Sequence, residues 1–132
     1  MSNDAASHEF LVLSRGQWDT DKSNAEIQRA IDDFYAWYER LVAEGTVRRG
    51  HRLAREGKTI SKHRIADGPF AEAKEVIGGY WTIVAGSLDE AAAIAACNPC
   101  IACGLTFEVR PIETRRASAY EPGNETPGVN AA

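Results

Sequence analysis

The sequence has neither an excess of basic charge nor a long apolar run, and each absence excludes a class of protein. Its 132 residues carry a formal net charge of −4 at pH 7, with a pI near 5.4. Binding of nucleic acid or of an anionic membrane needs basic residues that neutralise phosphates, so neither partner is expected. No stretch approaches the length of a membrane span, and the N-terminus MSNDAASHEF lacks the basic and apolar regions of a signal peptide. We therefore expect a cytoplasmic protein.

Motifs for cofactors and metals are also missing or incomplete. The chain has no G-x-G-x-x-G, no P-loop and no nucleophile elbow, so no organic cofactor is expected. Cys97, Cys100 and Cys103 are spaced like the start of an iron–sulfur ligand run, but the fourth position falls at Phe107. No further cysteine or nearby histidine completes a zinc site. We therefore expect no metal, and small buried thiols near a helix end.

The spacing of apolar residues predicts the element order βαββαβ. The first and third strands are apolar on both faces, which is typical of interior strands. Each helix follows a Ser-x-x-Glu capping box, and Gly45 and Pro99 end them. The predicted strands are residues 10–14, 58–65, 76–85 and 105–110, and the predicted helices are residues 24–44 and 88–97.

This order predicts an α+β fold, a ferredoxin-like antiparallel sheet with two helices on one face. Because two strands are apolar on both faces, the uncovered face of the sheet needs a cover. A second copy of the chain is the natural one, which predicts a homodimer. The folded domain is expected over residues 8–112. Residues 1–7 are expected to be disordered and residues 113–132 to form a flexible tail, from their Ala, Gly, Asn, Pro and Glu content.

The stretch DGPFAEAKEVIGGYW, residues 67–81, holds several signals close together. Asp67 and the Gly-Pro pair after it predict a stiff turn. Asp67 is either a plain turn former or a site residue that acts as a base or an orienting acceptor. The charged run that follows is typical of solvated ion pairs. Gly78 and Gly79 indicate a bulge or a close backbone approach, which leaves room for a ligand or for a partner chain.

The segments DGPFAEAKE, GGYW and FEVRPI resemble the DGPF branch of the YCII-related family over roughly residues 10–112. The resemblance implies a ferredoxin-like unit that pairs into a dimeric α+β barrel, without an established substrate. It carries over the turn by position, residues 67–70, with Glu72, Lys74 and Glu75 behind it. Members of this branch are often found beside alternative sigma factors, which would suit a non-catalytic module that senses a ligand or binds another protein.

The wider family includes members proposed to use a His–Asp pair, one group being a dehydrochlorinase that eliminates chloride from a chlorinated hydroxyquinol. Those members share a helix histidine whose position falls near Phe34 and Tyr35 here, so that histidine is absent. The candidate acid–base histidine of this chain is His51, since the turn after the first helix commonly opens onto the uncovered sheet face. The alternative is that His51, beside arginines on a polar segment, is simply solvated.

Glu108 and Arg110 share the face of the last strand opposite the core. There they could grip a small polar ligand in the cleft between two sheets, or form a salt bridge. The leading hypothesis is a homodimer that binds a small anionic or phenolic molecule near the turn, with cofactor-independent acid–base chemistry. Its catalytic candidates are Asp67, His51 and Arg110. Its ligand-binding candidates are Gly68, Pro69, Phe70, Gly78, Gly79, Tyr80, Trp81 and Glu108.

Overall fold

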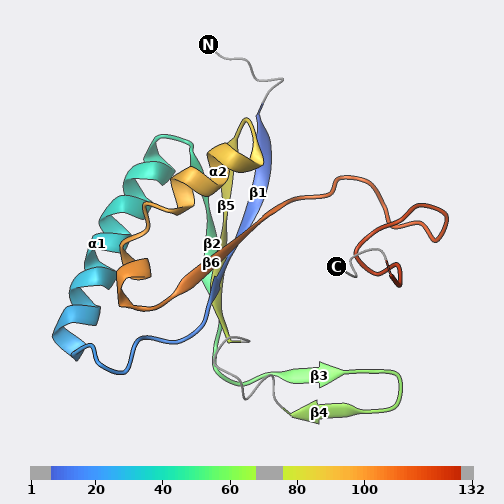
Figure 1. Ribbon diagram of the computed structural model, residues 1–132, viewed down its shortest axis with the longest axis horizontal. Helices are drawn as coiled ribbons and strands as arrows, with labels where there is room; N and C mark the ends of the chain where they lie inside the picture. Colours follow the sequence, from blue (N-terminus) through green and yellow to red (C-terminus); the bar gives the residue numbers. More distant parts are fainter. Residues whose placement is uncertain (1–6, 68–75, 129–132) are drawn as a thin grey trace.

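The chain folds as two helices packed on one face of an antiparallel sheet, as the computed structural model shows (Figure 1). The structure describes residues 7–67 and 76–128. The strands are β1 (His8–Arg15), β2 (Val47–Arg52), β3 (Lys58–Ile60), β4 (Ile65–Asp67), β5 (Ile77–Ala85) and β6 (Thr106–Pro111). The helices are α1 (Asn24–Ala43), α2 (Leu88–Ala95) and the short 3₁₀ helix η3 (Pro99–Cys103).

The main sheet has the strand order β2-β5-β1-β6, and every neighbouring pair is antiparallel. The two strands that were expected to be interior, β1 and β5, occupy the centre. This order, with its two helices on one face, confirms the α+β ferredoxin-like fold. Antiparallel sheets commonly pack one face against the core and leave the other face open. This sheet likewise has one face covered by helices and one open face.

The helices begin where their capping boxes predict. The Ser23 hydroxyl accepts the backbone N–H of Glu26, and the Glu26 carboxylate accepts the N–H of Ser23 in return. At the other end, Gly45 adopts a φ of +83°, which few residues other than glycine adopt, and stops the helix after Glu44. In α2 the Ser87 hydroxyl accepts the N–H of Glu90 in the same way. The helices predicted over 24–44 and 88–97 are therefore confirmed to within two residues.

The core lies between the helices and the covered face of the sheet. Alternate residues of β1 and β5 point into it, including Val12 and Ile83, which are fully buried. From α1, Tyr38 and Leu41 meet them, and Ala91 and Ala95 let α2 lie close to the sheet. The other face of the sheet is half-exposed, although Leu11, Leu13, Tyr80 and Val84 lie on it. We call it the open face.

The prediction for the second strand of the sheet was wrong. The strand beside β5 is β2, residues 47–52, where a weak pattern led us to expect no strand. Only Val47 of its six residues is buried, because β2 is an edge strand with polar side chains on most of its length. The segment expected as one strand over 58–65 instead forms β3 and β4, which pair with each other in a separate two-stranded sheet.

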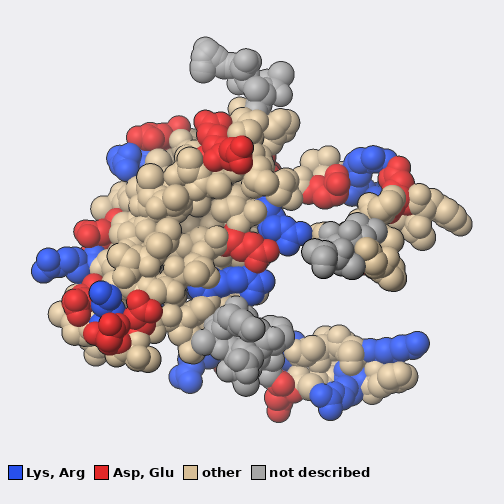
Figure 2. Space-filling model, viewed as in Figure 1, with Lys and Arg blue, Asp and Glu red and all other residues tan. Residues whose placement is uncertain are grey.

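This β3–β4 arm, residues 58–67, projects from the body on the side away from the helices, and the segment after β6 extends on the same side (Figure 1). The arm carries more basic than acidic side chains, which Figure 2 shows as blue at its outer end. Ile60 and Ile65 face each other across it and are 74% and 69% exposed. The arm therefore contributes little to the core of its own chain.

Candidate functional site

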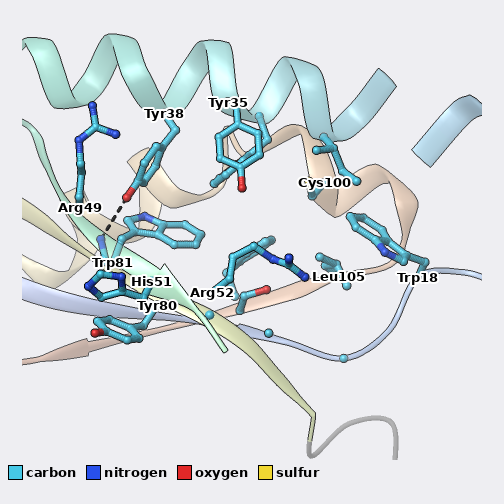
Figure 3. Close-up of a pocket in the computed structure, with 18 of the residues that line it drawn as sticks. Trp18, Tyr35, Tyr38, Arg49, His51, Arg52, Tyr80, Trp81, Cys100 and Leu105 are labelled. Atoms are coloured by element: carbon cyan, nitrogen blue, oxygen red, sulfur yellow. Dashed lines mark hydrogen bonds between the residues drawn. The ribbon is translucent and has the colours of Figure 1, made fainter. Parts of the chain in front are cut away.

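A pocket of about 700 Å³ opens between α1 and the covered face of the sheet. Its walls are mainly aromatic, and they come from the segment after β1, from α1 and from the strands below it (Figure 3). The aromatic side chains that line it are Trp18, Phe34, Tyr35, Tyr38, Trp81 and Phe107. Ring centroids of Phe34 and Trp81 lie 5.4 Å apart, and those of Trp81 and Phe107 lie 5.5 Å apart, so the floor is a packed cluster of rings.

Two β-bulges shape the sheet beneath this pocket. In β2, Arg49 and Gly50 lie between the pairs Arg48–Thr82 and His51–Tyr80, so two residues face one on β5. In β5, Gly78 is the extra residue between the positions opposite Ser14 and Arg15. Bulges bend a strand and redirect its side chains, and both of these lie on the pocket wall.

Glycine is required at two positions here because the backbones approach closely. A Cβ on Gly50 would lie 1.8 Å from the carbonyl oxygen of Tyr80, and one on Gly79 would lie 2.8 Å from that of His51. At Gly78 the nearest atom would be the Ser14 hydroxyl, at an ordinary 3.6 Å. The glycine pair thus gives both expected features, a bulge at Gly78 and a close approach at Gly79.

Polar contacts tie α1 to β2 along one side of the pocket. The backbone N–H of Gly50 donates to the hydroxyl of the buried Tyr38 at 3.1 Å, as the dashed line in Figure 3 shows. Two nitrogens of the Arg49 guanidinium donate to the two carboxylate oxygens of Glu39. These hydrogen bonds hold the pKa of the Glu39 carboxyl below its usual value and raise the pKa of Arg49. Both links fix the height of the helix above the bulged strand.

His51 lies at the edge of the sheet and is exposed. It pairs across the strands with Tyr80, and their rings meet edge to face with centroids 5.9 Å apart. Both residues contribute to the pocket lining at its outer margin. Trp81, the next residue of β5, points the other way: it is 5% exposed and packs into the core beneath the pocket.

The other two catalytic candidates lie elsewhere in the chain. Asp67 ends β4 on the arm, where its carboxylate is paired with Lys58 and its side chain is 87% exposed. Arg110 lies on β6, at the opposite edge of the sheet from His51. Three strand spacings separate these edges, roughly 14 Å. Within one chain the structure therefore does not bring Asp67, His51 and Arg110 together.

Glu108 and Arg110 take part in an ion-pair cluster on the open face. The Arg15 Nε donates to Glu108 at 2.6 Å, and the Arg110 Nη1 donates to the other carboxylate oxygen at 3.0 Å. The Arg15 hydrogen bond and then that of Arg110 lower the pKa of the Glu108 carboxyl. This is the salt bridge that the sequence left open as an alternative. Gly68, Pro69 and Phe70, the remaining ligand-binding candidates, lie outside the described residues.

The cysteines lie at the far end of the pocket from His51 and beyond it. Cys100 lines the pocket, is buried, and its thiol contacts the carbonyl oxygen of Ala30 at 3.8 Å. Burial raises the pKa of the Cys100 thiol to about 11. Cys103 is buried as well, whereas Cys97 is exposed. Over residues 7–67 and 76–128, no group of three His, Cys, Asp or Glu side chains is placed to hold a metal ion.

Several pocket residues were not among the sequence candidates. Tyr35 is 43% exposed, and its hydroxyl points into the space under α1 (Figure 3). Arg52 and Trp18 line the pocket as well, and neither lies in a strand or helix that the sequence predicted. Their roles depend on which face of the sheet the helix covers. An arginine on the covered side of the mostly polar strand β2 indicates a ligand site only once β2 has been recognised as a strand.

Comparison with known protein families finds that residues 10–115 match the YCII-related domain. No curated protein matches the chain. In the described part of the chain, no helix is long and apolar enough to cross a membrane. The matched segment begins in β1 and ends just after β6, so it contains all of the four-stranded sheet except the first two residues of β1, both α-helices and the pocket. The chain therefore belongs to the YCII-related family.

Proposed function

We propose that this YCII-related protein binds a small anionic or phenolic molecule in the pocket between α1 and the sheet. The observation that carries the proposal is the aromatic lining of a cavity of about 700 Å³, within the range of small-molecule sites. Aromatic walls favour a flat ligand, and Arg52, on the covered face of β2, supplies a cationic group at its margin. This moves the expected ligand site from the cleft between two sheets to the helix-covered face.

We further propose that the functional unit is a homodimer in which two open faces pack together. Leu11, Leu13, Tyr80 and Val84 are half-exposed on that face, and a second sheet would bury them. The arm and the segment after β6 both extend on this side, where they would flank such a partner (Figure 1).

His51 stays the acid–base candidate, although its side chain lies with Tyr80 on the open face and reaches the pocket only at its outer margin. Its imidazole is exposed beside the Tyr80 ring, where a ligand that extends past the edge strand could contact it. Proton transfer to or from a phenolic ligand, or an elimination, needs such a group within reach of the reacting atom. Asp67 keeps a role in this scheme only through movement of the arm or through the partner chain, because in its own chain it is paired with Lys58.

The test is binding of a defined panel: benzoate, salicylate, phenol, catechol and hydroquinone. Thermal shift and quenching of Trp fluorescence report binding, since Trp18 and Trp81 line the pocket. Ile31→Trp would fill the pocket from α1, and Gln28→Trp places the same side chain on the exposed side of that helix as a control. We expect a ligand that binds the wild type and Q28W but not I31W. Equal binding to I31W would place the site elsewhere.

Turnover of the bound compound distinguishes an enzyme from a binding module. The compound is incubated with the protein and followed by NMR. If it is converted, His51→Gln should abolish conversion while leaving the dissociation constant within about threefold, because a general base acts on the barrier more than on binding. Binding without conversion would favour the alternative of a non-catalytic ligand-sensing module.

A further inference from the structure

One arginine of the main sheet differs from all the others. The four-stranded sheet contains Arg15, Arg48, Arg49, Arg52 and Arg110. Four of them are paired with a carboxylate: Arg15 and Arg110 with Glu108, Arg48 with Glu9, and Arg49 with Glu39. Over the residues that the structure describes, Arg52 makes no ion pair, although it lines the pocket. Within the described chain, the guanidinium of the sheet that has no carboxylate partner thus lies at the cavity.

No acidic group of the described pocket lining is free to neutralise Arg52. Glu39 is the only carboxylate among the lining residues, and both of its oxygens accept from Arg49. Gly79 stands opposite Arg52 in the strand pairing, where the two backbones approach closely. Figure 3 shows the Arg52 side chain extending under α1, below the Tyr35 hydroxyl and between the aromatic walls. A ligand anion could reach it there without displacing a protein carboxylate.

The buried polar groups of the pocket also lack acceptors. The indole Nε1 of Trp81 is buried and has no hydrogen-bond partner among the described residues, and the residue is 5% exposed. An indole N–H can only donate, and a buried donor without an acceptor is destabilising. Tyr38 accepts the N–H of Gly50, which leaves its own hydroxyl proton available to donate. The pocket therefore offers hydrogen-bond donors and a positive charge, surrounded by aromatic rings.

Resting on the proposed function, we propose that the pocket selects an aromatic carboxylate, with Arg52 as its specificity-determining residue. A carboxylate is planar and has two acceptor oxygens that match the fork of donors on a guanidinium. The ring of the ligand lies against Trp18, Tyr35 and Phe107, and its carboxylate faces the unpaired charge. A neutral phenol of the same size gains the aromatic contacts but not the charge-assisted hydrogen bonds.

The experiment compares 2-naphthoate with 2-naphthamide, which share a ring system and differ in charge. Calorimetric titration of the wild type should give at least about tenfold tighter binding of the carboxylate, the gain from one charge-assisted contact. Arg52→Gln should remove that preference while the amide still binds with its wild-type affinity. Arg52→Lys should keep part of it, because the charge remains but the fork is lost. Arg55→Gln, which changes an exposed arginine outside the pocket lining, is the matched control and should leave both affinities unchanged.

The outcomes separate this inference from the function on which it rests. Equal affinity of the wild type for the two compounds, or an unchanged preference in R52Q, overturns the role of Arg52 while an aromatic site stands. Absence of binding of either compound to the wild type overturns the aromatic pocket and the carboxylate selection together. Circular dichroism of R52Q confirms that any loss does not come from unfolding.

Discussion

Glu108 lies between two guanidinium groups, and its ionisation should make the stability of the protein depend on pH. Hydrogen bonds from Arg15 and Arg110 lower its pKa in the folded state. A lowered folded pKa means that the carboxylate stabilises the fold above its unfolded pKa and that this stabilisation is lost as the pH falls through the folded pKa. At neutral pH the contribution should be about 1 kcal/mol, because the group is partly exposed.

We therefore expect Glu108→Gln to lower the free energy of unfolding at pH 7 and to differ less from the wild type as the pH falls below the ordinary carboxyl range. Urea unfolding at a series of pH values measures the difference. Arg115, whose pairing with Glu121 lies in the exposed segment after β6, offers a control: Glu121→Gln should change stability little at any pH. A difference between E108Q and wild type that is constant with pH would contradict the assignment.

The glycines under the pocket should respond to alanine according to backbone contact. Gly50→Ala and Gly79→Ala each place a methyl group against a backbone atom that cannot move independently of the sheet. We expect each to lower the free energy of unfolding by about 3 kcal/mol or more. Gly78→Ala should stay within about 1 kcal/mol of wild type, because only the Ser14 hydroxyl lies near. Thermal and urea denaturation measure the loss of stability in the three variants. Equal losses would show that the conformational freedom of glycine, and not contact with the added methyl group, causes the loss.

At this scale the sequence identified the glycine pair but not the reason for it. Gly-Gly before an apolar strand indicates a bulge or a close approach, and both occur. Gly50 gave no such signal, because its need arises from the Tyr80 carbonyl oxygen on a strand that lies thirty residues later in the chain. A distant backbone atom leaves no trace in the local sequence pattern.

Helix α1 has local sequence signals at both of its ends, and it forms one wall of the pocket. Ser23→Ala removes the side chain that accepts the N–H of Glu26, and typical losses for such caps are about 1 kcal/mol. We expect that loss in urea unfolding, together with faster amide exchange in the first turn of the helix. Ser61→Ala on the arm is the control, since its hydroxyl makes only an exposed 3.4 Å contact and should change stability by less than about 0.5 kcal/mol. Equal losses of stability in S23A and S61A would contradict the stabilising role of this cap.

The elements differ in how far their sequences determine them. The helices were predicted closely because capping boxes and a helix-ending glycine or proline are local signals. Strand β2 was missed because an edge strand with a single buried residue shows almost no alternation. The β3–β4 arm was expected as one strand of the sheet, and its polar composition fits either placement. What assigns it to a hairpin of its own is that β2 already occupies the position beside β5.

For the whole molecule, the open face leads to a prediction about association. If two open faces pack together, Leu13→Glu should yield a monomer, because a buried charge without a partner would stand in the interface. Sedimentation velocity at micromolar concentration should give a dimer for the wild type and a monomer for L13E, with unchanged circular dichroism. Leu88→Glu, at an exposed position at the start of α2 and away from the open face, is the control and should remain dimeric. A monomeric wild type would contradict the proposed dimer.

By itself, the sequence determined both α-helices and their ends, the strands β1, β5 and β6, the central position of β1 and β5, and the one-sided covering of the sheet. These depend on periodicity and caps, which act over a few residues. Only the tertiary structure decided that the cavity lies under α1 and that Arg52, at its wall, has no carboxylate partner among residues 7–67 and 76–128. The reason is physical: a cavity is space left between elements that meet from distant parts of the chain, and the partners of a charge come from equally distant parts.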